Sequence, residues 1–387
     1  MQQAVTVNHD IAEAAVQQAA TVDHDIAEAE EAILKAAKHV KHVKNAKLMR
    51  EYSNKKMEEA LDDTNNDAPW SERRDCFVAD FCQNMGLPHM GENQPGETYY
   101  FSPLGIYCFG VANVGKTVHD LRAYIFQEGQ AKKGGDTVAS LLYRHIKDCG
   151  LIDVSKGARK ELTIVMDNCG GQNKNRMVLR LALLFVDLGF YKQVNCLFLV
   201  AGHTKTSCDR LFHVLKIAYR RQNVVAMKHL IEVLNTCQYV TAVQVNDGDI
   251  KHFEKFENTI YKGIATGTVN RSHIFWCVDT GKGILQVRDT VEDISEGSTQ
   301  DLRLKGMSDE QRQLLVDNMN LEVVEPDGIK DIKKVEMFKK WRRYVPPGDV
   351  DDPIYADPGK SIIAEINKKR SDKARKRRKT VTTTVAL

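Results

Sequence analysis

The chain has 387 residues, of which 42% are hydrophobic and 28% are charged, and its formal net charge is +3. These values are typical of a soluble globular protein with one large domain or two ordinary ones. Apolar runs are far shorter than the roughly 18 residues of a membrane span, and the N-terminus lacks the basic and apolar segments of a secretory signal. The nine cysteines form no CxxC pair, so we expect reduced thiols and neither a disulfide framework nor a zinc site.

Residues 1–66 contain no proline or glycine and are rich in Ala, Glu and Lys, which favours a long helix or a helical hairpin, partly disordered. The stretch 6–14 recurs fifteen residues later as 21–29, with Asp23 replacing Asn8. That spacing keeps both copies on roughly one face of a helix. The repeat is either a duplication without function or a coiled-coil interface, and in the second case the protein is a homo-oligomer.

A single domain is predicted over residues 72–295, including a C-terminal extension. Apolar runs predict strands, and amphipathic runs between them predict helices, in the order β-β-β-α-β-α-β-α. This order indicates an α/β fold with a ribonuclease H-like mixed five-stranded sheet flanked by helices: an antiparallel meander followed by parallel additions. The predicted strands are 76–81, 99–111, 121–127, 162–166 and 194–200, and the predicted helices are 136–149, 177–188 and 207–219.

The extension is predicted to contain a helix at 225–237 and strands at 239–245, 273–278 and 284–288, with a hairpin turn at 279–283. Residues 296–360 read as a loop-rich peripheral region, and 361–387 as a disordered basic tail. Residues 360–379 hold ten Lys or Arg against two acidic residues. This tail predicts a nuclear protein, with an import signal or an arm that binds nucleic acid.

Three carboxylates stand where the predicted strands and helices bring them together. Asp80 lies near the end of the first strand, Asp167 follows the fourth strand, and Asp209 lies in the first turn of the helix after the fifth. Converging carboxylates repel one another unless a cation is present, and Mg²⁺ or Mn²⁺ prefers such oxygen ligands. Taken singly, Asp80 could be an ordinary strand-end residue, and Asp209 could be a helix-dipole carboxylate.

The segment after Asp167 is a polar turn at the mouth of a predicted parallel strand, where ligands of α/β sheets bind. Gly170 and Gly171 would permit positive φ and close backbone approach. His203 is predicted to position a group or shuttle a proton, and Glu128 to act as an accessory ligand or as an ion-pair partner of Lys132 or Lys133. The predicted contacts to a phosphate backbone come from Gln172, Asn173, Lys174 and Asn175.

A resemblance to a known family rests on this turn and on two later motifs. The segments Asp167-Asn-Cys-Gly-Gly-Gln-Asn-Lys-Asn175, Gly202-His-Thr204 and Cys208-Asp209-Arg210 resemble an uncharacterised eukaryotic domain family found in transposon-derived proteins. Further matches lie at 80–88, 124–128 and 341–346, and the similarity extends over roughly residues 40–350. That family is similar to DDE transposases and integrases of the ribonuclease H fold. The resemblance therefore implies metal-dependent cleavage or transfer of DNA strands, by an active enzyme or in an inactive, domesticated descendant that only binds DNA.

Two other functions compete with this one. The stretch 110–117 matches the Walker A spelling, with Lys116 as its lysine. That motif holds phosphates only where the loop leads from a strand into a helix. Residues 118–126 read at least as well as a turn followed by a strand, so a P-loop nucleotide-binding protein is an alternative and a hairpin is the other outcome. The third possibility is a non-catalytic DNA-binding or scaffold protein.

Overall fold

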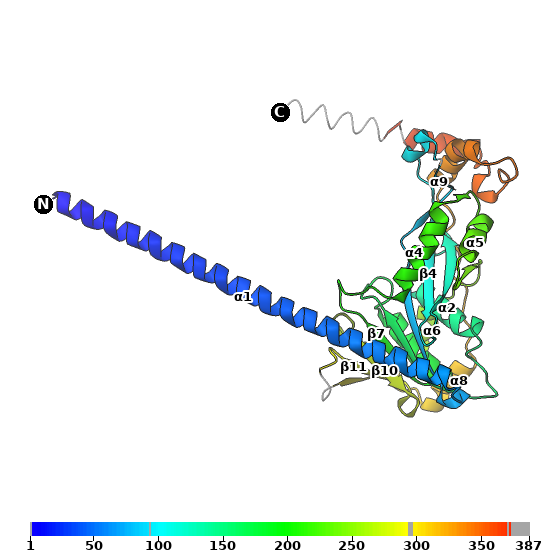
Figure 1. Cartoon of the computed structure of the whole chain (residues 1–387), viewed down its shortest axis with the longest axis horizontal. Helices are drawn as coiled ribbons and strands as arrows, with labels where there is room; N and C mark the ends of the chain where they lie inside the picture. Colours follow the sequence, from blue (N-terminus) through cyan, green and yellow to red (C-terminus); the bar gives the residue numbers. More distant parts are fainter. Residues whose placement is uncertain (1, 93, 293–296, 370, 373–387) are drawn as a thin grey trace.

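The computed structural model describes residues 2–92, 94–292, 297–369 and 371–372, and gives no side-chain environment for residues 2–27 and 29. Its body is a large mixed sheet flanked by helices, and the helix α1 (Gln2–Asn65) leaves this body as a long rod (Figure 1). The N-terminal end of α1 therefore lies far from the sheet. None of the described helices has the length and apolar character that crossing a membrane requires.

The sheet has ten strands in the described chain, and nine of them follow one path in the order β12-β11-β10-β7-β6-β1-β4-β5-β9. The tenth, β2 (Met85–Leu87), pairs with β4, and β3 (His89–Met90) forms a separate small sheet with β8 (Asn223–Val224). The strands on the main path are β1 (Arg74–Phe81), β4 (Leu104–Asn113), β5 (Asp120–Gln127), β6 (Arg159–Met166), β7 (Tyr191–Phe198), β9 (Val240–Gln244), β10 (Ile274–Val278), β11 (Ile284–Arg288) and β12 (Ser298–Asp301).

Strand directions divide the centre of the sheet into two halves. β1 runs antiparallel to β4, and β4 antiparallel to β5, which forms a meander. β6 is parallel to β1, and β7 is parallel to β6. The predicted mixed α/β sheet flanked by helices is thus confirmed, but five further strands join the five that were predicted at its centre.

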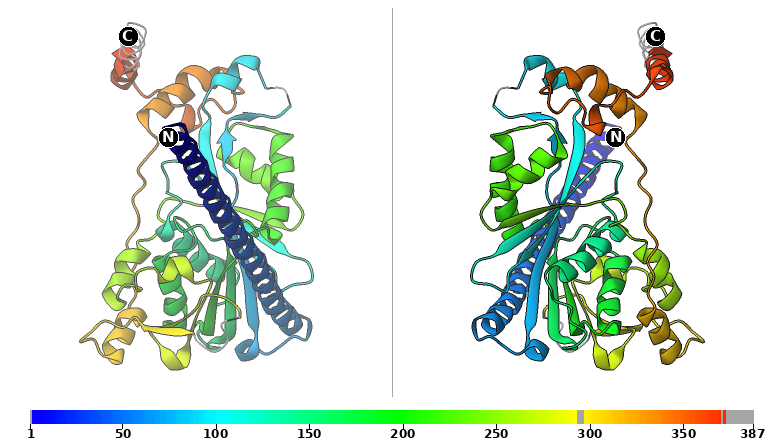
Figure 2. Two further views of the ribbon diagram at one scale, coloured as in Figure 1. Left: turned by 90° about the vertical axis from the view of Figure 1, so that its left-hand side faces the viewer. Right: turned by 90° about the vertical axis from the view of Figure 1, so that its right-hand side faces the viewer.

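Helices cover both faces of this sheet (Figure 2). α2 (Gly135–Asp148), α3 (Arg176–Asp187) and α6 (Phe253–Ile260) pack on one face, and α4 (Ser207–Arg220), α5 (Met227–Asn235) and the C-terminal part of α1 pack on the other. β1 shows why both faces need cover. Phe77 and Ala79 belong to the core beneath α2 and α3, whereas Cys76 and Val78 belong to the opposite core. A strand that is apolar on both sides is typical of the buried centre of an α/β sheet.

The remaining described elements are short. They include the helices α7 (Thr268–Arg271), α8 (Asp309–Asp317) and α9 (Asp331–Glu336), the 3-10 turns Trp70–Glu72, Gly96–Tyr100, Asp279–Gly281, Arg342–Tyr344 and Pro353–Tyr355, and a π turn at Met337–Trp341. Residues 360–369 are helical as well, so the first part of the tail that was predicted to be disordered forms a helix. The turn at Asp279–Gly281 joins β10 to β11 at the predicted hairpin. The residues predicted to be a loop-rich peripheral region thus include α8, α9 and several turns.

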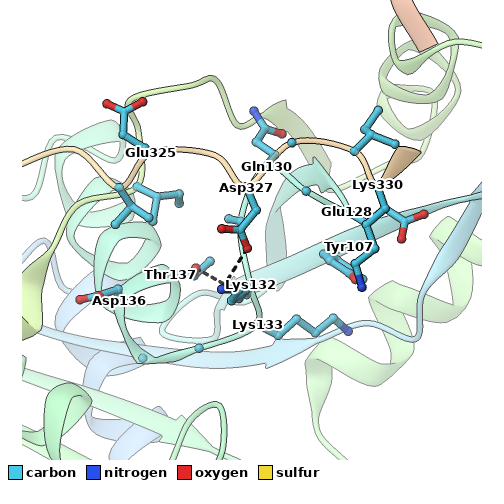
Figure 3. Close-up of a pocket in the computed structure, with 18 of the residues that line it drawn as sticks. Tyr107, Glu128, Gln130, Lys132, Lys133, Asp136, Thr137, Glu325, Asp327 and Lys330 are labelled. Atoms are coloured by element: carbon cyan, nitrogen blue, oxygen red, sulfur yellow. Dashed lines mark hydrogen bonds and ion pairs between the residues drawn. The ribbon is translucent and has the colours of Figure 1, made fainter. Parts of the chain in front are cut away.

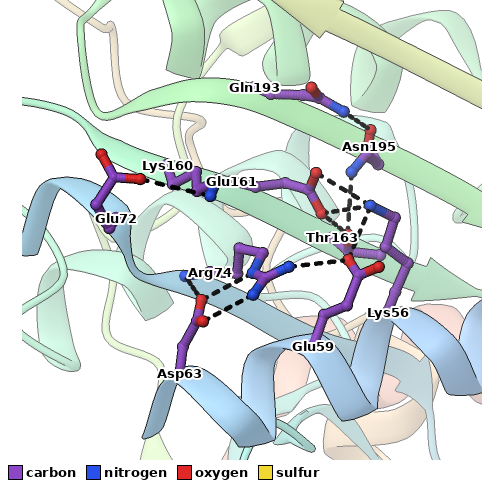
Figure 4. A network of polar contacts seen from close by, with 10 residues as sticks. All are labelled: Lys56, Glu59, Asp63, Glu72, Arg74, Lys160, Glu161, Thr163, Gln193 and Asn195. Carbon is purple, nitrogen blue, oxygen red and sulfur yellow. Dashed lines mark hydrogen bonds and ion pairs between the residues drawn. The ribbon is translucent and has the colours of Figure 1, made fainter. Parts of the chain in front are cut away.

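The C-terminal part of α1 docks on the sheet through charged side chains (Figure 4). Lys56 donates to the carboxylate of Glu161 at 2.9 Å, and Arg74 pairs with Asp63 at 2.8 Å and with Glu59 at 3.4 Å. Glu161 is buried on β6 and would lose hydration without a partner. The helix therefore supplies the charge that this strand residue needs.

The peripheral region is fixed to the body by a buried ion pair. Arg312 of α8 donates to the carboxylate of Asp187 at the end of α3, and the Tyr261 hydroxyl donates to the same oxygen at 2.5 Å. Arg312 and Asp187 are 2% and 1% exposed. Removing one partner of such a pair leaves an uncompensated buried charge, so the contact ties α8 firmly to α3.

Candidate carboxylate site

Asp80 and Asp167 come together because β1 and β6 are parallel and in register. Ala79 lies opposite Met166 in the last pair of that register, so the residues that follow, Asp80 and Asp167, stand side by side. Both are at the carboxyl ends of their strands and are half-buried. This edge is where open α/β sheets place their ligands.

The electrostatics of Asp80 reflect this crowding. Burial raises the pKa of the Asp80 carboxyl to about 7, and the negative charges of Asp167 and Asp209 act in the same direction. The backbone N–H of Phe81 donates to Asp80 Oδ1 at 2.7 Å, which opposes the shift. Asp80 therefore retains a proton in conditions where an ordinary carboxyl is ionised, as expected where negative charges converge without a bound cation.

The turn after Asp167 holds that carboxylate in place. Asn173 donates from Nδ2 to Asp167 Oδ1 at 2.6 Å, and the Cys169 N–H donates to the same oxygen at 3.2 Å. The Cys169 carbonyl accepts from three successive backbone N–H groups, those of Gln172, Asn173 and Lys174. The turn is thus closed by its own hydrogen bonds, and two of its groups hold the Asp167 carboxylate in one position.

Most of the polar side chains predicted to contact phosphate are used inside the chain. Asn173 is fully buried, and Lys174 is 3% exposed, with its Nζ donating to the Asn270 carbonyl at 3.3 Å. Burial lowers the pKa of Lys174 to about 8. Asn175 caps α3 by accepting from the N–H groups of Met177 and Val178. Gln172 is half-buried, and it is the member of the four best placed to meet a phosphate.

The two glycines of the turn do not have the conformation predicted for them. Neither Gly170 nor Gly171 has a positive φ. A Cβ added to Gly171 would meet no atom within 4 Å, and one added to Gly170 would only touch the Lys174 carbonyl at 3.8 Å. The turn is closed by hydrogen bonds to the Cys169 carbonyl, and its residues adopt this turn without a positive φ.

Asp209 lies close to this pair but is turned toward its own helix. It is the third residue of α4, and its Oδ2 accepts from the Thr206 N–H at 2.7 Å in a capping box. The neighbouring Cys208 donates from Sγ to the Val78 carbonyl at 3.1 Å, which fixes the start of α4 on β1 near Asp80. Within the described chain, no three His, Cys, Asp or Glu side chains are grouped as metal ligands. The ligand set Asp80, Asp167 and Asp209 remains a prediction.

His203 makes its contacts with α1. Its ring lies 5.4 Å from the ring of His42, centroid to centroid, and its carbonyl accepts from Arg50 at 2.7 Å. The side chain is exposed. The structure thus shows His203 packed beside α1, and a proton-shuttle role for it remains a prediction.

Lys133 lies at the site, although the sequence suggested it only as an ion-pair partner of Glu128. Its ammonium lies 4.9 Å from the ring centre of Phe81 and 5.1 Å from that of Tyr107. Burial lowers the pKa of Lys133, against the attraction of groups that include Asp80 and Cys169. The sequence signal that could have identified Lys133 is its position in a basic, glycine-containing turn before α2.

Glu128, the acidic residue considered as a partner of Lys133, has other contacts. It pairs with Lys333 at 3.5 Å and accepts from the Gly105 N–H.

A pocket of about 1070 Å³ opens beside Lys133 and Tyr107, between the turn after β5 and residues 324–334 (Figure 3). Lys132 and Asp327 form an ion pair across it at 2.9 Å. Four lysines and six carboxylates line it: Lys132, Lys133, Lys330, Lys334, Glu128, Asp136, Glu254, Glu325, Asp327 and Asp331. The acidic excess disfavours a polyanion inside the pocket.

The P-loop alternative is wrong for this structure. Residues 110–113 belong to β4, and the chain then turns directly into β5 at Asp120, so the segment is a hairpin. Lys116 pairs with Asp120 at 3.1 Å. A Walker loop needs a helix whose first N–H groups face the phosphates, and a strand cannot provide them.

Comparison with known proteins finds a similarity to one domain family of unknown function. Residues 103–293, just under half of the chain, match the model of a family described as a domain of unknown function, DUF7869. The match includes Asp167 and Asp209 and begins after Asp80. No curated protein matches the chain.

Two solved structures are similar at a low level. A crystal structure of NurA with manganese is 13% identical with a TM-score of 0.13, and a second crystal structure of NurA is 11% identical with a TM-score of 0.12. The alignments cover 67% and 76% of this chain. The chain spans 51% and 59% of the two NurA chains. Such scores carry no argument about fold or function.

Proposed function

We propose that the protein cleaves or transfers DNA strands with the help of a divalent metal ion, in the manner of ribonuclease H-fold transposases. The observation that carries this proposal is the pairing of Asp80 with Asp167 at the ends of two parallel strands, with Asp209 close enough to raise the pKa of Asp80. Each of these residues stands at one of the positions where that fold carries its acidic residues.

The strand order supports the proposal. The central strands follow the order β5-β4-β1-β6-β7, with the meander β1-β4-β5 antiparallel and both β6 and β7 parallel to β1. This is the arrangement expected for a ribonuclease H-like sheet. The carboxylates lie at the end of β1, just after β6 and in the first turn of α4.

The residues present fit a hard divalent cation. Asp80 and Asp167 offer carboxylate oxygens on adjacent strands, and a cation between them would offset the repulsion from Asp167 that, after burial, raises the pKa of Asp80. Asp80 and Asp167 would hold the ion, and Asp209 would join them once its carboxylate leaves Thr206. A bound ion would stabilise the charge that develops on phosphate oxygens during displacement. Asn173 orients Asp167 for this role, and Lys133 adds positive charge beside Asp80.

The decisive test is nicking of supercoiled plasmid DNA in Mn²⁺ by the wild type and by Asp167→Asn. Loss of one ligand of the ion should lower the nicking rate by about a hundredfold or more. Asp62→Asn is the matched control, because it removes an exposed carboxylate from α1 and leaves the site intact. Equal nicking by wild type and Asp167→Asn would remove Asp167 from the mechanism.

One observation favours a second candidate, a descendant that binds DNA without cutting it. The Asp209 carboxylate is occupied by the cap of α4, which leaves the predicted ligand set incomplete. Retention of DNA in a gel-shift assay, with no nicking in Mn²⁺ or Mg²⁺, would select this function. The basic tail, of which residues 370 and 373–387 lie outside the described chain, would then be its nuclear import signal or its DNA-binding arm.

A further inference from the structure

The projecting part of α1 exposes a row of apolar side chains. Ile33 is 69% exposed, Val40 is 65% exposed and Val43 is 42% exposed. With Ala36, which is also exposed, they occupy positions spaced three and four residues apart on one side of the helix. Residues 30–41 are all exposed, and contacts of α1 with the body begin at His42 and Lys44. Exposed apolar side chains in such a row indicate an unfilled packing surface.

The row differs from the face that α1 presents to its own sheet. Ala46, Met49, Ser53 and Ala60 are buried against the body. At about 100° per residue, their mean direction lies about 130° around the helix from that of the exposed row. A second helix can therefore lie along the exposed row while α1 remains docked.

In the sequence, the exposed row is one part of a heptad repeat of apolar residues that runs from Val5 to Val43. Positions a and d of this repeat are apolar at eleven of twelve places, and the exception is an asparagine. The a positions are Val5, Ala12, Ala19, Ile26, Ile33 and Val40, and the d positions are Asn8, Ala15, Val22, Ala29, Ala36 and Val43. A seven-residue apolar repeat sustained over six heptads is the pattern of a two-helix coiled coil.

Charge along the helix decides which partner fits. Residues 2–34 contain seven Asp or Glu and no Lys or Arg, whereas residues 35–50 contain six Lys or Arg and no Asp or Glu. Two parallel copies would place acidic against acidic and basic against basic. Two antiparallel copies that cross near Ile33 place the acidic half of each helix against the basic half of the other.

We propose that the exposed row of α1 pairs with the same row of a second copy of this chain, as an antiparallel coiled coil centred near Ile33. In this register Ile33 of one copy meets Ala36 of the other, and Ala29 meets Val40. The pairing is independent of the carboxylate site.

Sedimentation velocity of the full chain tests the interface. We expect a dimer of twice the 43.7 kDa chain mass at about 10 µM protein. Ile33→Glu puts a charge into the row and should raise the dimer dissociation constant about a hundredfold. Leu34→Glu is the matched control, because Leu34 is 54% exposed but lies off the row. Circular dichroism then checks that both variants keep the helix content of the wild type.

Two measurements test the direction of pairing. Salt screens opposite charges, so raising NaCl from 0.05 to 0.5 M should raise the dissociation constant of an antiparallel dimer by about tenfold. For disulfide trapping, Ala29→Cys mixed with Val40→Cys should cross-link, whereas Val40→Cys alone should not, with the exposed Cys149 replaced by Ser in both. A monomeric wild type, or equal damage by Leu34→Glu, would overturn the interface. Tighter association in salt, or cross-linking of Val40→Cys with itself, would overturn the antiparallel arrangement.

Discussion

Asp80→Asn should stabilise the protein, and the gain should grow with pH. The folded chain binds a proton at Asp80 with a pKa of about 7, against an ordinary value near 3.8. Because the folded pKa is the higher one, the stabilising effect of this proton is complete below pH 3.8 and is lost as pH rises through 7. Asparagine has no charge to lose and keeps the same shape.

The magnitude follows from these two values. Between pH 5 and pH 8 the wild type should lose at most about 2.5 kcal/mol that Asp80→Asn does not lose. Water still reaches part of the Asp80 side chain, which makes this figure an upper value. Urea unfolding of both proteins at several pH values, without added metal, measures the difference in the free energy of unfolding.

The control for that experiment is Asp62→Asn, which removes one negative charge from the exposed side of α1. A stability difference between Asp80→Asn and the wild type that stays constant from pH 5 to pH 8 would refute the reasoning. Added Mn²⁺ at pH 8 supplies a second check. The ion should raise the melting temperature of the wild type more than that of Asp80→Asn, because it replaces the missing proton with a stronger positive charge.

Three further substitutions have defined outcomes. Arg312→Met should cost about 3–5 kcal/mol of unfolding free energy in urea, because the buried Asp187 loses its cation; an unchanged midpoint would contradict a buried pair. Gly129→Ala should lower the free energy of unfolding by roughly 1–3 kcal/mol in the same assay. Gly129 has a φ of +87°, and a Cβ there would lie 2.4 Å from the Gly328 carbonyl oxygen. An unchanged free energy of unfolding would show that residues 324–334 do not pack closely against this turn. Isothermal titration should detect no ATP binding by the wild type or by Lys116→Ala, because a hairpin follows β4; binding that Lys116→Ala abolishes would restore the P-loop.

The central strands and helices were predictable because each carries its own pattern. The apolar run before Asp167 became β6, and the amphipathic stretch after Asn175 became α3, which begins one residue earlier than predicted. The joining of β10, β11 and β12 to the edge at β7 was not predictable as part of the same sheet. It depends on pairing between segments about 80 residues apart, such as Phe275 with Cys196, which no local pattern records.

The neighbouring positions of Asp80 and Asp167 were predictable from the sequence, and their surroundings were less so. Asp80 and Asp167 stand at the ends of apolar runs, and the parallel pairing of the two strands in register places them together. His203 illustrates the limit, because the docking of α1 puts His42 and Arg50 beside it. Lys133 packs on Phe81 and Tyr107, an arrangement that only the folded sheet creates.

The continuity of α1 gives the projecting helix a fixed rotational phase relative to the sheet. The helix has no break between Gln2 and Asn65, so its free part, about 65 Å long from Gln2 to the docked Ala46, turns with the part that Lys56 and Asp63 attach to the strands. Adding one residue near position 45 would rotate the entire exposed row by about 100°, whereas adding seven would rotate it by only about 20°. Evolution of this protein is therefore expected to change the length of the projecting helix by whole heptads, since other changes would point the exposed row toward a different side of the body.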